Sequence, residues 1–397
     1  MKRSASNDRP TWERITRIEL PTGQVKLRVV VLILLILIAV ISMGYGVNAL
    51  LTTEPGIQEI TVLSGEMNCG DEFTFYYDLG GGDISATEEQ KALRTLYSQT
   101  ATDALRLFSA DAAFEGCQNL WDINHRVNET VVVSGALYEA LSLLENSGTR
   151  YHYLGPVYEI YQALFLSSDD SEAAEYDPYL NEELKSFFAE TAVFVNDPEA
   201  VELELLGENT VRLQVSEDYL RFAEENGITR FVDLFWMKNA FIADYMAEIL
   251  VEAGYTRGTL MSVDGFIRSL GEVPGAEFTF TLSHREGNVI SEMAVLPFSQ
   301  AVNMVYLHDY PLGGGNYYVR EDGTIRSPFV DTADGLCKSA LPELAAWSSS
   351  RSCGEILLEI APLYIADTLD EKALASLDGI EACYCEGQTV RYTAEER

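Results

Sequence analysis

Residues 233–263, DLFWMKNAFIADYMAEILVEAGYTRGTLMSV, decide the fold class of this chain. Apolar side chains recur here at the i, i+3, i+4, i+7 and i+8 spacing of one helix face: Ala243, Met246, Ala247, Leu250 and Val251. Gly254 is a suitable residue for ending that helix, and residues 259–263 then predict a β-strand. A helix followed closely by a strand predicts a domain that contains both kinds of element.

Helix and strand signals continue irregularly on both sides of this stretch. Further predicted elements are helices at 87–108 and directly after Ser134, strands at 73–77 and 278–282, a hairpin over 201–215 that turns at Glu208-Asn209, and a surface loop at 167–180. No internal repeat occurs at a fixed period. The sequence therefore predicts an α+β fold with two or more layers.

An apolar run near the start predicts a membrane span. From residue 29 to residue 43 every side chain except Ser42 is apolar, and seven Lys or Arg residues precede or open the run. Basic flanks are retained on the cytoplasmic side of a membrane. We expect residues 1–28 to be a cytoplasmic tail, 29–51 a transmembrane helix, 52–70 a linker and lead-in, and 71–397 an extracytoplasmic domain. A cleaved signal peptide, with residues 47–49 as a weak cleavage site, is the alternative.

Charge is distributed unevenly along the chain. Residues 1–51 contain only three of the 62 Asp and Glu residues, and the formal net charge of the chain is −35. An acidic domain repels nucleic acid and anionic lipid headgroups, so we expect no nucleic-acid partner and a solvated surface. Together with the apolar run at 29–51, this charge pattern predicts a single-pass protein of the cell membrane.

All six cysteines follow the apolar run. An even number in an oxidising compartment permits disulfides, although their pairing cannot be read from the sequence. Cys383 and Cys385 lie in a predicted strand, where their side chains would share one face. The chain contains no CxxC motif and no His/Cys spacing that is typical of a metal site.

Four blocks, in order, resemble the FAD:protein FMN transferases, the ApbE-like flavin transferases. The first block runs from 108–124 and 131–134 into LGPVYEIY at 154–161, which is similar to the end of the family's D-P-T-V-G-P-L-V-D-L-W; the D-P-T portion falls on 151–153 and does not match. Residues 233–244 resemble D-L-G-G-I-A-K-G-Y-A-A-D. Residues 260–271 are similar to a strand, a Gly-Gly turn and a following Ile-Arg. Asp322-Gly323 with residues 328–335 resembles D-G…H-I-x-D-P-x-T-G. The chain departs from these motifs at several positions. Four glycines are replaced, by Phe235, Trp236, Ala240 and Asp264. The lysine of the motif is replaced by Asn239, and the histidine by Pro328.

The resemblance implies a fold, cofactors and site residues. Family members bind FAD with a divalent metal and transfer FMN to a Thr or Ser hydroxyl of an exported partner protein. By this likeness Asp331 has a catalytic role, Asp233, Asp244, Gly265 and Gly335 bind FAD, and Mg²⁺ is held at 354–360 by Glu355 and Glu359. We expect an ApbE-like flavin-transferase fold behind one N-terminal transmembrane helix.

Three functions follow as hypotheses. The first is Mg²⁺-dependent transfer of FMN from FAD to an exported flavoprotein. The second is an inactive ApbE-like subunit that binds or assembles partners at the membrane surface, because Phe235 and Trp236 put rings where a dinucleotide needs bare backbone. The third is a solute-binding or wall-associated domain that is unrelated to flavin.

Overall fold

The computed structural model describes residues 30–31, 33–40, 42–43, 52–65, 67–273, 275, 277–287, 289–312 and 316–393. Residues 54–397 form one compact unit, and residues 1–53 form another. The described residues of the expected span at 29–51 are helical, and its other residues lie outside the description. Among the described residues, no helix combines the length and the apolar character that crossing a bilayer requires.

The centre of the larger unit is an antiparallel sheet of eight strands, in the order β1-β2-β6-β7-β10-β13-β14-β15. A smaller sheet has the order β3-β5-β4, and β8-β9 and β11-β12 form two-stranded pairs. The strands are β1 (Gly56–Glu59), β2 (Phe73–Leu79), β3 (Thr130–Val132), β4 (Val201–Gly207), β5 (Thr210–Val215), β6 (Gly258–Ser262), β7 (Phe266–Ser269), β8 (Phe278–Glu286), β9 (Val289–Phe298), β10 (Asn303–His308), β11 (Tyr318–Val319), β12 (Ile325–Arg326), β13 (Glu343–Ser348), β14 (Glu381–Glu386) and β15 (Thr389–Tyr392).

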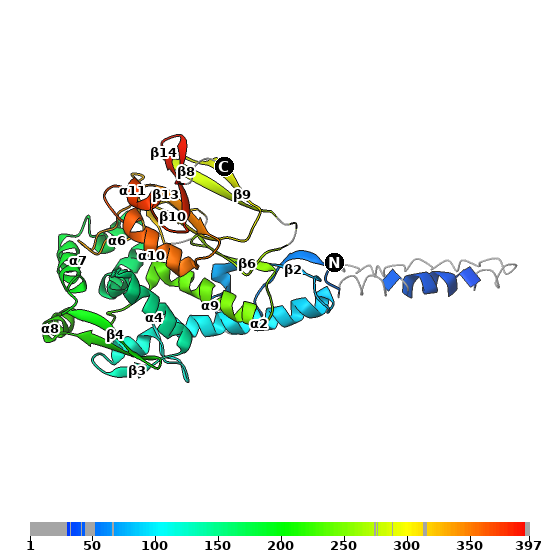
Figure 1. The fold of residues 1–397 in the computed structure, drawn as a ribbon, viewed down its shortest axis with the longest axis horizontal. Coiled ribbons are helices and arrows are strands. Elements are labelled where there is room, and N and C mark those ends of the chain that lie inside the picture. The colour runs from blue at the N-terminus through cyan, green and yellow to red at the C-terminus, as the bar shows by residue number, and fades with distance from the viewer. Residues whose placement is uncertain are drawn as a thin grey trace, which may run out of the picture. The chain divides into compact units, whose positions relative to one another are not determined.

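Helices cover one face of the large sheet (Figure 1). The α-helices are α2 (Ala86–Leu107), α3 (Leu120–His125), α4 (Gly135–Ser147), α5 (Gly155–Tyr161), α6 (Asp170–Tyr176), α7 (Glu182–Val195), α8 (Glu217–Asn226), α9 (Lys238–Glu252), α10 (Cys353–Tyr364) and α11 (Glu371–Ala375). Short 3₁₀ turns are η2 (Gly70–Glu72), η3 (Tyr151–Tyr153), η4 (Gln162–Leu166) and η5 (Phe235–Met237). Helix α9 contacts β6 and β7, and α10 contacts β10 and β13.

The β8-β9 hairpin covers part of the other sheet face. Strand β13 is buried along its whole length and sends alternate side chains to the two sides. Leu344 and Ala346 join the core beneath the helices, whereas Ala345 and Trp347 join a second core beneath the hairpin. The domain therefore has three layers: helices, sheet and hairpin.

Local signals account for most of these elements. Ser134 caps α4 by accepting the backbone N–H of Leu137, as predicted. The predicted hairpin turn is confirmed, because Glu208 and Asn209 both have positive φ between β4 and β5. The predictions of α2, α9, β2, β6 and β8 are also confirmed, with ends shifted by a few residues.

The predicted surface loop at 167–180 is wrong in part. This segment contains α6. The side chain of Asp169 accepts the backbone N–H groups of Ser171 and Glu172, and Ala173 is fully buried. An acidic N-cap and one buried apolar residue are enough for a two-turn helix, although the composition is that of a loop.

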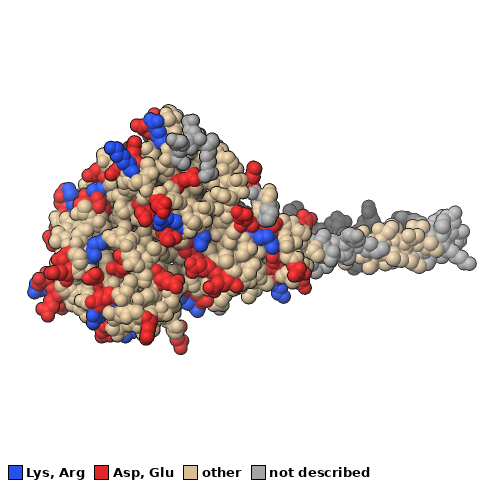
Figure 2. Space-filling view, viewed as in Figure 1, with Lys and Arg blue, Asp and Glu red and all other residues tan. Residues whose placement is uncertain are grey.

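Acidic side chains are spread over the visible face of the described residues and outnumber basic ones there (Figure 2). They do not gather into one patch in this view. This distribution agrees with the solvated surface that the composition predicts.

Candidate functional site

The turn at Asp233 positions the first set of predicted residues. Asp233 is buried, and its carboxylate accepts hydrogen bonds from the Arg230 guanidinium (2.8 Å) and from the backbone N–H of Phe235 (2.9 Å). Phe235 has φ +34°, a backbone conformation that glycine adopts freely and other residues adopt under strain. The turn thus keeps a glycine-like backbone at the position where the resemblance expects glycine, but it carries a ring.

Five rings meet at this turn, and we call them the aromatic cluster: Tyr151, Tyr158, Phe235, Trp236 and Phe329. The indole N–H of Trp236 donates to the hydroxyl of Tyr158 (3.1 Å), and its ring packs edge-on against Phe329 and Tyr151. Phe235 packs against Tyr158 at 5.0 Å between ring centres. Trp236 is only 4% exposed and belongs to the core, and the half-buried Phe235 packs against that core.

Asp331 lies in a tight loop that a lysine holds. The Lys338 ammonium lies 2.9 Å from Asp331, 3.0 Å from Asp334 and 3.5 Å from Asp367. Burial lowers the pKa of Lys338, but hydrogen bonds to Asp331 and Asp334 raise that pKa above its ordinary value overall. The Lys338 ammonium therefore offsets one of the three negative charges around it and takes up an oxygen of both Asp331 and Asp334. Burial raises the pKa of Tyr151 in the aromatic cluster, and the charge of Asp331 adds to that rise.

Two predicted glycines are required by packing. Gly265 has φ +100°, and a Cβ there would lie 2.2 Å from the backbone oxygen of Tyr306 on β10. Gly335 has φ +72°, and a Cβ there would lie 2.8 Å from the Cβ of Phe188 on α7. Each glycine therefore allows two backbone segments of this chain to approach each other.

Asp244 ties α9 to the start of α10. Its carboxylate accepts the backbone N–H groups of Cys353 (3.0 Å) and Gly354 (2.8 Å) and pairs with Arg268 on β7 (2.9 Å). Burial raises the pKa of Asp244, while the Arg268 charge and the two N–H groups oppose that shift. The Asp244 carboxylate therefore binds groups of α10 and β7.

Glu355 and Glu359 belong to the same helix, α10, but have separate partners. Glu355 completes a capping box, because it accepts the backbone N–H of Ser352 (2.7 Å) while Ser352 accepts the N–H of Glu355. Glu359 is exposed and lies 3.8 Å from Arg351. In the described part of the chain, neither glutamate belongs to a group of ligand atoms close enough to hold a metal ion.

Of three pockets in the described part of the chain, only one is lined by a predicted residue. A pocket of about 330 Å³ lies beside β6, β7 and the β8-β9 hairpin, and none of the predicted site residues lines it. Asp244 lines a pocket of about 100 Å³. Small-molecule sites typically enclose about 300–1,000 Å³, so the pocket at Asp244 is too small for a dinucleotide.

The one potential metal-binding group among the described residues is His284, Glu343 and Cys385. Sequence reasoning found the strand that contains Cys385 but missed this group. Its members belong to three strands that are distant in sequence, so no local spacing could indicate that they meet.

The fold is similar to that of solved flavin transferases. It matches the flavin transferase ApbE from Vibrio cholerae with a TM-score of 0.55 and 13% identity, over 85% of this chain and 97% of that chain. It matches the ApbE protein from Thermotoga maritima MSB8 with a TM-score of 0.55 and 12% identity, over 83% and 94%. For the Pseudomonas stutzeri flavinyl transferase ApbE in its apo form, the TM-score is 0.52 and the identity 14%, over 85% and 94%.

The predicted resemblance to ApbE proteins is confirmed at the level of fold. Identities this low establish a common architecture and leave the chemistry to be argued from the residues. The sequence itself matches no protein-family model and no curated protein.

Proposed function

We propose that this protein uses a flavin-transferase fold to bind or assemble exported partners at the outer face of the cell membrane, without transferring flavin. The observation that carries this proposal is the aromatic cluster. Phe235 and Trp236 stand where the related motif has glycines, and both rings pack against other aromatic rings. A dinucleotide can approach the backbone closely only where side chains are absent.

The carboxylates that the resemblance assigns to catalysis and metal binding have other partners, which supports the same proposal. Asp331 pairs with Lys338, Asp244 and Glu355 stabilise the start of α10, and Glu359 lies near Arg351. Mg²⁺ is usually held in octahedral geometry by one or two free carboxylates together with waters and substrate phosphates. These residues do not fit Mg²⁺, and the turn does not fit FAD, so we derive no catalytic step through either group.

The second candidate function is Mg²⁺-dependent transfer of FMN from FAD to a Thr or Ser of an exported flavoprotein. It is favoured by the extent of the likeness, which covers 94–97% of three solved flavin transferases. Fold alone does not fix function, because unrelated functions recur on one fold. This candidate requires FAD to bind at a turn that carries the rings of Phe235 and Trp236.

A titration with FAD separates the two candidates. The full-length protein in detergent is heated with and without FAD and Mg²⁺ while its melting temperature and flavin fluorescence are followed. Binding at a ligand concentration of 100 Kd would add about 2.7 kcal/mol and raise the melting temperature by several degrees. We expect no such shift for the wild-type protein.

A double substitution tests whether the rings of Phe235 and Trp236 are what prevents FAD binding. We expect Phe235→Gly with Trp236→Gly to permit FAD binding, and Phe194→Ala, which removes a ring from a cluster around Tyr219, to have no such effect. A Mg²⁺-dependent shift in the wild-type protein, with FMN added to an acceptor domain by intact mass, would refute the proposal and establish the transferase.

A further inference from the structure

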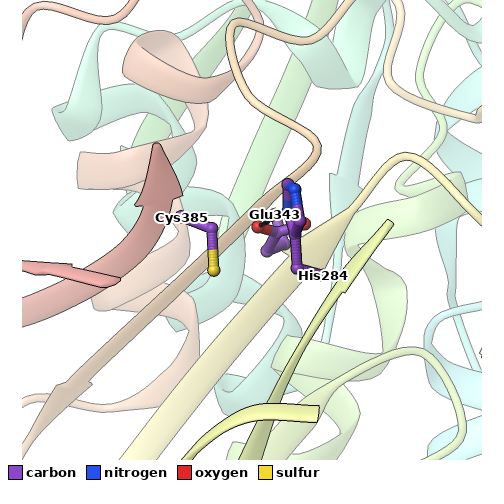
Figure 3. A group of neighbouring side chains, drawn as sticks. All are labelled: His284, Glu343 and Cys385. Carbon is purple, nitrogen blue, oxygen red and sulfur yellow. Dashed lines mark hydrogen bonds and ion pairs between the residues drawn. The ribbon is translucent and has the colours of Figure 1, made fainter. Parts of the chain in front are cut away.

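A buried group of three different ligand types lies between the hairpin and the sheet. His284 is on β8, Glu343 opens β13 and Cys385 is on β14 (Figure 3). Each offers one ligand atom, and these atoms all lie within 4.8 Å of one another. The exposed fractions are 6% for His284, 0% for Glu343 and 2% for Cys385. None of the three is among the site residues predicted from the sequence.

Strand register brings the three side chains together. Leu344 pairs with Tyr384 and Ala345 with Cys383, so one further step along the ladder sets Glu343 opposite Cys385 on the same sheet face. On β8 the buried side chains alternate as Phe280, Leu282 and His284. The two apolar members of that row pack into the core beneath the hairpin, which directs the imidazole to the same face.

The buried carboxylate of Glu343 has a single ion-pair partner among the described residues, an imidazole that is charged only when protonated. One of its oxygens lies 2.7 Å from Nδ1 of His284, and this is its only ion pair in the described part of the chain. Removing a carboxylate from water costs several kcal/mol unless a cation compensates it. A bound divalent cation would supply that compensation.

Two tyrosine hydroxyls bind the backbone next to His284, and one of them also lies beside the Glu343 carboxylate. The hydroxyl of Tyr310 lies 3.3 Å from the second oxygen of Glu343 and 2.8 Å from the backbone oxygen of Ser283, next to His284. The hydroxyl of Tyr306 lies 3.1 Å from the same backbone oxygen. Such surrounding hydrogen bonds orient metal ligands and are a common feature of metal sites.

We propose that His284, Glu343 and Cys385 form a binding site for Zn²⁺. A nitrogen, an oxygen and a sulfur ligand are the types that zinc accepts, and three protein ligands leave a fourth tetrahedral position for water. The thiolate excludes Mg²⁺ and Ca²⁺ as preferred ions. With bonds of about 2.0–2.3 Å the ligand atoms stand roughly 3.3–3.8 Å apart, so the His284–Glu343 contact opens by less than about 1 Å.

The test uses the full-length protein in detergent with a thiol-free reductant. After metals are removed with a chelator and the chelator is dialysed away, the protein is titrated with Zn²⁺, and separately with Co²⁺ as a spectroscopic probe. We expect one ion per chain, together with the thiolate-to-cobalt absorption and the visible bands of a tetrahedral site. We also expect Zn²⁺ to raise the melting temperature, because the ion joins the hairpin to the sheet.

Variants assign the ligands. We expect Cys385→Ser, His284→Gln and Glu343→Gln each to weaken Zn²⁺ binding by at least about 100-fold. Cys383→Ser is the matched control, since Cys383 is fully buried on the same strand face but does not belong to the group, and it should keep the cobalt–thiolate band. Circular dichroism checks that each variant folds.

Two results would overturn the site. The first is a wild-type protein that takes up no Zn²⁺ or Co²⁺ at micromolar concentrations, which would show that the group is only a buried His–Glu pair. This measurement uses the wild-type protein alone, so it does not depend on the folding of any variant. The second is a cobalt–thiolate band that survives Cys385→Ser. Neither result depends on FAD, so failure of this site and failure of the proposed binding function are distinguishable.

Discussion

At the scale of single residues, ion pairs and hydrogen bonds within the protein engage the carboxylates to which the sequence resemblance assigns a site role. Lys338 is the clearest case, because its ammonium is within 3.0 Å of both Asp331 and Asp334. The sequence placed these two aspartates in one motif, but it gave no signal that the lysine of the same loop folds back onto them. Only the folded structure therefore distinguishes a metal site at Asp331 and Asp334 from an ion pair with Lys338.

Replacing Lys338 tests this interpretation. We expect Lys338→Met to lower the free energy of unfolding by about 1 kcal/mol at neutral pH, because it leaves the carboxylates of Asp331 and Asp334 facing each other without a cation. The matched control is Lys185→Met, whose partner Glu182 lies 4.0 Å away at the exposed surface, and it should change stability by only a few tenths of a kcal/mol.

The effect of Lys338 depends on pH in a definite direction. Its folded-state pKa lies above the ordinary value of 10.5, so the folded protein holds the proton more tightly than the unfolded chain does. The stabilisation is therefore complete below that ordinary value and is lost as the pH rises through the folded-state pKa. Urea unfolding should show a gap between wild type and variant that is constant from about pH 7 to 10 and narrows above it. A gap that widens with rising pH would contradict the ion pair.

At the scale of elements, one helix end joins three parts of the domain. The start of α10 carries a capping box from Ser352 and Glu355 and also receives the carboxylate of Asp244 from α9. Arg268 of β7 pairs with the same carboxylate. Asp244 therefore links two helices to the central sheet.

We expect Asp244→Asn to destabilise the protein by about 3 kcal/mol, because the substitution leaves the Arg268 guanidinium without its buried partner. Ser134→Ala at the start of α4, where the cap is a single hydroxyl contact, is the control and should cost about 1 kcal/mol. Chemical denaturation of both variants measures the difference. Equal losses would show that Asp244 is an ordinary cap.

The elements were predictable where a local rule decides them. The Ser134 cap, the turn at Glu208-Asn209 and the helical stripe ending before Gly254 each depend on neighbouring residues alone. Helix α6 was missed because one buried alanine and an aspartate cap outweigh a loop-like composition. The His284, Glu343 and Cys385 group was missed because sheet order, which brings its strands together, is not encoded in any local pattern.

At the scale of the whole molecule, the fold and the site residues lead to separate conclusions. The fold covers nearly the whole length of solved flavin transferases, although identity is only 12–14%. Pattern order over a long segment can therefore reveal a common architecture when individual motif residues have changed. Motif order does not carry the site over in the same way, because Phe235 has the positive φ of a glycine but carries a ring.

The proposed membrane orientation gives the last prediction. Basic residues concentrate before the apolar run and acidic residues after it, so the N-terminal tail should remain in the cytoplasm and the domain should be exported. Single cysteines at Ser6 and at the exposed Glu224 of α8 report the two sides, with the wild-type protein measuring background labelling of the native thiols. We expect a membrane-impermeant maleimide to label Glu224→Cys in intact cells and Ser6→Cys only after the membrane is permeabilised. The reverse pattern would refute the orientation, whereas loss of the Ser6→Cys label together with the N-terminal segment would establish the cleaved signal peptide instead.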